Sequence, residues 1–283
     1  MKRAFTLALA FVSLAVGAAG AAPSAGLQSA PTEADWRTPD PQNVLVIDTN
    51  KGRIIFELSP EAAPASTARV RELACAGVYN GRAFFRVIDD FMAQTGDPAD
   101  DGTGGSAKPN LPGEFTFRRS AQTSLVVVDQ SDGLESGFLE GLPVVSQTLD
   151  LALLTADNRV KAWGAFCAGV GGMARTQDPQ SGNSQFFLMR GVQRTLDQKY
   201  TAFGRTISGL DVIRSLKTGE PVPPPQDRML TVRVLADIPA AQRPSVRVID
   251  PRGPWFRAMV LRVRAEKAAD FSVCDLDLPS QIK

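Results

Sequence analysis

The chain has 283 residues, which is enough for one large domain or two small ones, and 43% of them are hydrophobic. Lys and Arg number 31 and Asp and Glu number 30, so the formal net charge is +1, without the basic excess expected of a nucleic-acid or membrane-surface binder. The sequence contains no histidine. This absence excludes a Ser/His/Asp triad, a Cys/His dyad and a His-ligated metal.

The first 21 residues have the organisation of a signal peptide. Lys2 and Arg3 supply the positive charge, and the apolar run over residues 5–16 is shorter than the about 20 residues that a membrane span needs. The small residues over 19–21 are typical of a cleavage site. We therefore expect a mature chain that begins at Ala22, has no membrane span and works in the periplasm or is secreted. An uncleaved anchor is the alternative.

Structure is expected to begin after a linker. Residues 22–42 are rich in Ala, Ser and Pro, which predicts a flexible segment. Residues 44–49 and 53–58 have β-strand character and flank a turn that contains Gly52, so they predict a β-hairpin.

Two short helices and a series of strands follow. Apolar spacing around Val70 predicts the first helix, with Pro64 in its first turn and Gly77 at its end. Apolar spacing over residues 210–216, with a stop at Gly219, predicts the second. Further strands are predicted at residues 84–88, 91–94, 124–128, 185–189, 200–207 and 230–238. This pattern favours a mainly β fold, a closed barrel capped by two short helices.

Three blocks, in order along the chain, carry the main functional signal. Residues 79–98 have the sequence YNGRAFFRVIDDFMAQTGDP, and GTGG follows at residues 102–105. The second block has GMAR at residues 172–175 and SGNSQFF at 181–187, and the third has LDQKYTAFG at 196–204. Ordered blocks are a more specific signal than one short motif.

Together these blocks resemble the signature of the cyclophilin-type peptidyl-prolyl cis/trans isomerases. The resemblance implies a closed eight-stranded barrel over residues 43–238, with an insertion at about 118–168 and a C-terminal extension at 239–283. It also implies an exported bacterial enzyme that isomerises Xaa-Pro bonds in unfolded or folding exported proteins. Twisting an amide needs neither a metal nor a cofactor nor a proton shuttle, so the absence of histidine is no obstacle.

The resemblance assigns roles to individual residues. Arg86 falls at the family's catalytic arginine, and its fixed charge and directed donors suit an amide nitrogen that becomes pyramidal as the bond twists. Gln94 is the second expected catalytic residue. Because Phe186 and Phe187 must point to opposite faces of a strand, only Phe187 is expected in the groove. The expected substrate-binding residues are Phe91, Met92, Ala174, Arg175, Gln185, Phe187, Leu196 and Tyr200.

Several positions depart from the family pattern. Phe85 and Tyr200 replace histidines, and Thr195 stands where many members have a large aromatic residue, so cyclosporin sensitivity should be weak. Arg175 replaces Asn and brings a charge to the edge of the groove. These departures leave two alternatives, a proline-peptide binding module or chaperone with little turnover, and a structural protein of the cell envelope.

The insertion contains apolar stretches at residues 125–128, 137–145 and 149–154. Such stretches must be buried or meet a partner. A packed subdomain without a catalytic part is the first interpretation. The alternative is a lid or client-docking surface beside the groove, which would make the insertion a site for a protein partner.

The C-terminal extension is expected to clasp the insertion. Residues 246–249 and 259–263 predict two strands, or a strand and a short helix. Cys167 and Cys274 lie outside the three blocks, so we expect them to form a disulfide that holds the clasp and leaves Cys75 free. Three unpaired thiols are the alternative.

Overall fold

The computed structural model describes residues 29–283. The predicted signal peptide and the first part of the predicted linker lie outside the described residues. Within residues 29–283, no helix is long and apolar enough to cross a membrane.

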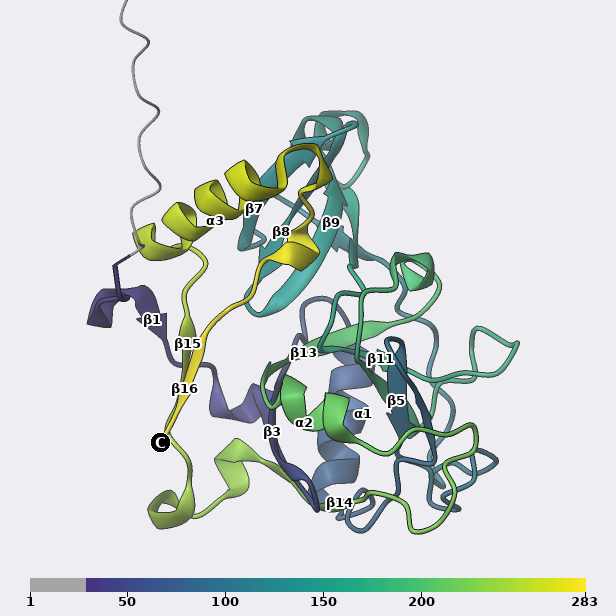
Figure 1. Cartoon of the computed structure of the whole chain (residues 1–283). Helices are drawn as coiled ribbons and strands as arrows, with labels where there is room; N and C mark the ends of the chain where they lie inside the picture. Colours follow the sequence, from purple (N-terminus) through teal and green to yellow (C-terminus); the bar gives the residue numbers. More distant parts are fainter. Residues whose placement is uncertain (1–28) are drawn as a thin grey trace, which may run out of the picture.

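An antiparallel sheet of eight strands forms the larger part of the fold (Figure 1). Its strands are β2 (Val44–Thr49), β3 (Gly52–Leu58), β4 (Arg86–Ile88), β5 (Met92–Thr95), β11 (Val170–Met173), β12 (Phe186–Met189), β13 (Ala202–Ser208) and β14 (Met229–Val234). Their order is β14-β2-β3-β13-β11-β12-β5-β4. The predicted hairpin is confirmed as the β2–β3 pair.

This sheet is open, so the predicted mainly β fold is confirmed but the predicted closure of the barrel is not. Its edge strands β14 and β4 do not form a strand pair with each other, and the chain segments beside them meet through the isolated bridges Ala83–Arg228 and Val87–Gly219 and a few further backbone hydrogen bonds. The chain over residues 221–225 is rich in proline, which has no N–H and cannot continue a strand ladder. The sheet therefore curls without closing along this edge.

Both predicted helices are confirmed. α1 (Pro64–Cys75) packs against β14, and α2 (Leu210–Ser215) packs against β3. Val70 and Leu73 of α1 are fully or almost fully buried, and they belong to the core cluster enclosed by the curled sheet. The apolar spacing that predicted α1 is therefore the face that the sheet buries.

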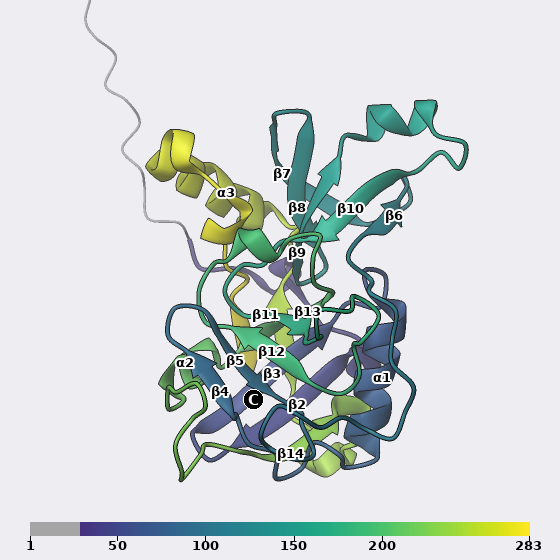
Figure 2. The ribbon, with the colours of Figure 1, turned by 90° about the vertical axis from the view of Figure 1, so that its right-hand side faces the viewer.

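The insertion forms a second sheet of five strands. These are β6 (Phe117–Arg119), β7 (Leu125–Ser131), β8 (Leu134–Leu139), β9 (Leu142–Gln147) and β10 (Val160–Gly164), in the order β6-β10-β9-β8-β7. The strand predicted at 124–128 is β7 and lies in this sheet. Figure 2 shows the second sheet beyond one end of the first. The insertion is therefore a packed subdomain.

Both ends of the described chain meet in a third sheet. β1 (Trp36–Arg37), β15 (Val246–Ile249) and β16 (Ser280–Ile282) form a three-stranded sheet in the order β1-β15-β16. The segment from residue 33 to residue 43 is thus ordered, unlike the predicted flexible linker. The physical reason is that β1 pairs with β15 and that Arg37 forms a bidentate ion pair with the buried Glu57 of β3.

The extension contains the strand β15 and a helix of 14 residues, α3 (Pro254–Lys267), so the predicted strand followed by a helix is confirmed, whereas the alternative of two strands is wrong and the helix is longer than predicted. Pro254 is its first residue, and its buried residues Phe256, Met259 and Val260 follow helical spacing. The ring of Phe256 meets Phe138 of β8 edge to face, with centroids 5.5 Å apart. α3 therefore lies against the insertion, and the predicted clasp is confirmed.

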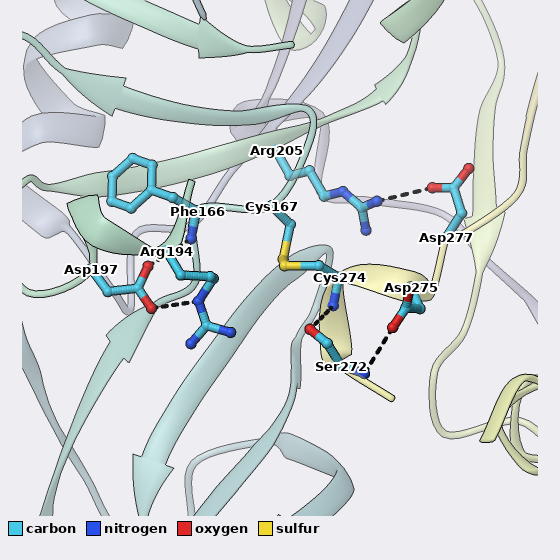
Figure 3. The surroundings of a disulfide bond; sticks show 9 residues. All are labelled: Phe166, Cys167, Arg194, Asp197, Arg205, Ser272, Cys274, Asp275 and Asp277. Carbon is cyan, nitrogen blue, oxygen red and sulfur yellow. Dashed lines mark hydrogen bonds and ion pairs between the residues drawn. A yellow bond between two sulfur atoms is a disulfide. The ribbon is translucent and has the colours of Figure 1, made fainter. Parts of the chain in front are cut away.

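The predicted disulfide between Cys167 and Cys274 is present, across 107 residues of sequence (Figure 3). The structure also contains short 3-10 helices at η1 (Glu33–Asp35), η2 (Pro41–Asn43), η3 (Leu149–Leu154), η4 (Arg194–Leu196), η5 (Leu235–Asp237), η6 (Ala240–Gln242), η7 (Ala268–Asp270) and η8 (Val273–Asp275). Cys274 lies in η8, and Cys167 follows β10, so the bond joins the extension to the end of the insertion.

Candidate active site

One row across the main sheet places a cation, an amide and an aromatic ring side by side. Arg86 of β4 lies opposite Gln94 of β5, and Gln94 lies opposite Phe187 of β12. Residues directly opposite each other on neighbouring strands point to the same face. Phe186 points to the other face, where its ring meets Tyr79, so the predicted choice of Phe187 for the groove is confirmed.

The row is connected by side-chain hydrogen bonds. Arg86 NH1 donates to Gln94 Oε1 at 3.4 Å, and Gln94 Nε2 donates to Gln185 Oε1 at 2.9 Å. Gln185 Nε2 in turn donates to the carbonyl oxygens of Gly102 and Gly104, at 3.1 and 2.8 Å. This chain sets the orientation of both glutamine amides relative to the arginine.

The predicted residues surround two adjoining hollows. The first, which we call the apolar pocket, has a volume of about 100 Å³ and is lined by Arg86, Phe91, Met92, Gln94, Ala174, Arg175, Phe187, Leu196 and Tyr200. The second, the polar cleft, has a volume of about 170 Å³ and is lined by Gln94, Gly102, Thr103, Gly104, Ala174, Arg175, Thr176, Ser181, Asn183 and Gln185. Every predicted site residue thus lies in one hollow or both.

Within residues 29–283, the walls of both hollows come from outside the insertion. The groove is therefore open in this arrangement, and the insertion does not form a lid over it.

A stack of aromatic rings forms the floor and one wall of the apolar pocket. Phe187 stacks on Phe166 with centroids 5.9 Å apart and meets Tyr200 edge to face at 5.7 Å. Gly172 leaves room for these rings, because a Cβ there would lie 2.3 Å from Phe187 Cζ. Phe166 is fully buried and follows the last strand of the insertion. The sequence contained no signal for its role.

Glu220 is a second residue that the sequence analysis missed. Its carboxylate accepts from Arg86 Nε at 2.6 Å and lies 2.5 Å from Arg86 NH2. The two residues are 134 positions apart, and Glu220 belongs to the loop between α2 and β14. It orients the guanidinium so that NH1 is the nitrogen that faces Gln94.

Arg175 covers the rim of the apolar pocket. Its guanidinium carbon lies 4.5 Å from the centroid of the Tyr200 ring and 5.6 Å from that of Phe115. Nε donates to the carbonyl of Lys199 at 3.1 Å, and NH1 donates to the carbonyl of Thr176 at 2.9 Å. These contacts give the charged group a defined position.

The loop that carries Arg194 and Asp197 is held against the end of the insertion (Figure 3). Asp197 accepts from the backbone N–H of Phe166 at 3.0 Å and from Arg194 Nε at 2.6 Å. The backbone N–H of Gln193 donates to the carbonyl of Phe166 at 2.8 Å. Burial raises the pKa of Asp197, and these hydrogen bonds oppose that effect.

Comparison with known proteins agrees with this geometry. The family model described as "Cyclophilin type peptidyl-prolyl cis-trans isomerase/CLD" matches residues 44–234, well over half of the chain. The chain belongs to the cyclophilin family. As a cyclophilin it is a peptidyl-prolyl cis-trans isomerase, and the predicted family is confirmed.

Two curated relatives carry the isomerase name. A "Probable peptidyl-prolyl cis-trans isomerase" of Brucella suis is 32% identical over 228 residues, which cover 77% of this cyclophilin and 86% of the relative. "Peptidyl-prolyl cis-trans isomerase 10" of Caenorhabditis elegans is 30% identical over 174 residues, which cover 62% of this chain and 81% of that protein.

A solved structure matches more of the chain. The crystal structure of cyclophilin AquaCyp293 from Hirschia baltica superposes with a TM-score of 0.82 at 39% sequence identity, over 90% of this chain and 98% of that one. A match of this extent reaches beyond residues 44–234. The cyclophilin from Hirschia baltica therefore resembles this one in more than the family region.

Proposed function

We propose that this cyclophilin isomerises Xaa-Pro bonds in exported proteins, and that Arg86 stabilises the twisted amide while the apolar pocket holds the proline ring. The observation that carries the proposal is the row of Arg86, Gln94 and Phe187 on one face of the sheet. The row places a guanidinium beside the pocket that the ring would occupy.

The physical problem is a rotational barrier of about 18–20 kcal/mol, which arises from amide resonance. In the twisted state the prolyl nitrogen becomes pyramidal and its lone pair is localised, so a fixed N–H donor binds it better than the planar amide. Glu220 engages Nε and NH2 of Arg86, whereas the NH1 contact to Gln94 is long, at 3.4 Å. NH1 is therefore the donor that we assign to the substrate nitrogen.

The other groups would bind and orient the peptide. Phe91, Met92, Phe187, Leu196 and Tyr200 supply apolar surface around the proline ring. Gln94 and Gln185 offer both donors and acceptors to the backbone amides beside the proline. Ala174 and Arg175 line both hollows, so a peptide that runs from one hollow to the other passes along them.

Two features of the chain support the proposal that the substrates of this cyclophilin are exported proteins. The N-terminal sequence has the organisation of a signal peptide. The disulfide between Cys167 and Cys274 is of the kind that persists in oxidising compartments such as the periplasm.

The test is the exchange rate of a short Xaa-Pro peptide, measured by NMR. We expect Arg86→Ala to lower kcat/KM by about 100-fold or more, as removal of a directed transition-state donor does in other enzymes. Arg86→Lys should recover only part of this loss, because lysine keeps the charge but not the planar donor geometry. The matched control is Arg262→Ala, an exposed residue of α3 that lines neither hollow, which should retain the parent rate.

An Arg86→Ala rate within twofold of the parent would contradict the assigned role of Arg86. Peptide binding without any exchange would instead favour the binding-module alternative.

A further inference from the structure

The two hollows of the groove share one charged side chain. The apolar pocket is lined by Arg86 and Arg175 and by no acidic residue, and Arg175 is the charged residue in the lining of the polar cleft. Gln94 and Ala174 are also common to both linings. A peptide that extends from the apolar pocket into the cleft therefore passes Arg175.

Arg175 differs from its neighbours because no carboxylate neutralises it. Arg86 is paired with Glu220, and Arg194 is paired with Asp197. Among the residues that the structure describes, no Asp or Glu oxygen lies within 4.0 Å of the Arg175 guanidinium, whose contacts are backbone carbonyls and aromatic rings. A half-buried cation of fixed position is thus left with donor capacity toward the groove.

The acidic residues of the loops beside the groove do not form an ion pair with Arg175. Asp101 accepts from the backbone N–H and hydroxyl of Thr103, at 2.8 and 2.7 Å. Asp178 accepts from the backbone N–H of Gln180 at 2.9 Å. Both carboxylates serve their own loops, and neither residue lines the pocket or the cleft.

We propose that Arg175 makes this cyclophilin prefer Xaa-Pro segments that carry an acidic side chain within two residues of the proline. An extended residue spans about 3.3–3.6 Å, so a proline in the apolar pocket brings its near neighbours past Arg175. A carboxylate there would gain a charge-assisted hydrogen bond to a guanidinium that is already in position. This inference rests on the proposed function, because it assumes that the apolar pocket holds the substrate proline.

The test compares peptides that differ only by Glu or Gln at each position within two residues of the proline, on either side. For the parent we expect a Glu-to-Gln ratio of kcat/KM of about two to five at one or more positions, as for a partly exposed ion pair. The ratio should fall as salt is raised from about 0.05 to 0.5 M, because added ions screen the interaction.

The variants identify the residue responsible. Arg175→Gln should bring the ratio to about one, and Arg175→Lys should keep it above one, because the charge remains. Each ratio compares two peptides on the same protein, so a general loss of activity or of folded protein cancels. Arg262→Gln, with the same charge change on α3 and far from the groove, should keep the parent ratio.

The outcomes separate this inference from the proposed function. Exchange of all peptides with a ratio near one, or a ratio that Arg175→Gln leaves unchanged, overturns the acidic preference and leaves the isomerase assignment intact. Absence of exchange with every peptide contradicts the proposed function instead. In that case the same pairs are compared by binding titration, where equal affinities for Glu and Gln peptides would overturn the Arg175 proposal as well.

Discussion

At the scale of single residues, the groove combines two arginines whose surroundings differ. Arg86 has an ion-pair partner in Glu220, which turns the guanidinium and leaves one nitrogen toward the pocket. Arg175 has carbonyl and ring contacts in place of a carboxylate. The first arrangement suits a group that acts on one atom of the substrate, and the second suits a group that attracts a charge of the substrate.

The sequence predicted the roles of some residues of the site and missed those of others. Arg86, Gln94 and Phe187 lie within the first two sequence blocks that resemble the family signature, and strand pairing brings these blocks into register. Glu220 and Phe166 lie outside them, in a proline-rich loop and at the end of the insertion. Their contacts depend on how distant segments pack, which local sequence does not encode.

Cys75 provides a prediction at the same scale. Its thiol is exposed and unpaired, and Sγ donates to Asp237 Oδ2 at 3.1 Å. Partial desolvation raises the pKa of Cys75, and the carboxylate of Asp237 raises it further, because both disfavour the thiolate. The thiol should therefore react with iodoacetamide more slowly than an ordinary exposed cysteine at the same pH.

Asp237→Asn removes the negative charge, so the pH profile of the alkylation rate should shift to lower pH. The profile is measured by mass spectrometry of the intact protein, with Asp211→Asn on α2 as the control for a general charge change. An unshifted profile in Asp237→Asn would show that Asp237 does not influence the thiol.

At the scale of elements, the end of the insertion supports the groove without lining it. Phe166 stacks behind Phe187, and its backbone holds Asp197 and Gln193 of the rim loop. The segment of the insertion between β9 and β10 is different, because Leu153 and Leu154 of η3 are 85% and 83% exposed. The apolar stretch at residues 137–145 is largely buried, and the stretch at 125–128 is only partly buried. The third stretch is mostly exposed, and a protein partner there stays a prediction.

Phe166→Leu tests the support of the pocket floor. Loss of the ring stack should lower kcat/KM by about three- to tenfold, mainly through a higher KM, since an aromatic pair contributes about 0.5–1.5 kcal/mol. The matched control is Phe138→Leu, which removes an equally buried ring from the same insertion. Both variants should lose stability in urea, and only Phe166→Leu should lose substrate affinity.

Equal kinetic losses in the two variants would show that the effect is general destabilisation. Parent kinetics in Phe166→Leu would show that the pocket floor does not need the second ring.

At the scale of the whole molecule, three distant segments form one body beside the curled sheet. The N-terminal segment and the C-terminal extension share a three-stranded sheet, the insertion forms its own sheet, and a continuous core joins all three segments to the curled sheet (Figure 1). Polar links cross the boundary between this body and the sheet, as Arg205 of β13 pairs with Asp277 at 3.0 Å and Arg37 pairs with Glu57. The disulfide adds a covalent link between extension and insertion.

The double variant Cys167→Ala/Cys274→Ala should lower the free energy of unfolding by about 2–4 kcal/mol. The reason is that the bond closes a long loop, across 107 residues, and restricts the unfolded chain. Urea denaturation measures the change, and Cys75→Ala, which removes an exposed free thiol, should stay within about 0.5 kcal/mol of the parent. Equal stability of the double variant and the parent would contradict a stabilising role for the bond.

The sequence by itself determined the family, the two helices, the hairpin, the residues around the groove and the pairing of Cys167 with Cys274. These features depend on local periodicity and on blocks of residues whose spacing strand pairing preserves. Tertiary structure alone decided that the sheet stays open, that residues 33–43 pair with the extension, that α3 packs on the insertion, and that Glu220 and Phe166 reach the groove. Such features arise from contacts between segments far apart in the chain, where burial and pairing override local propensity.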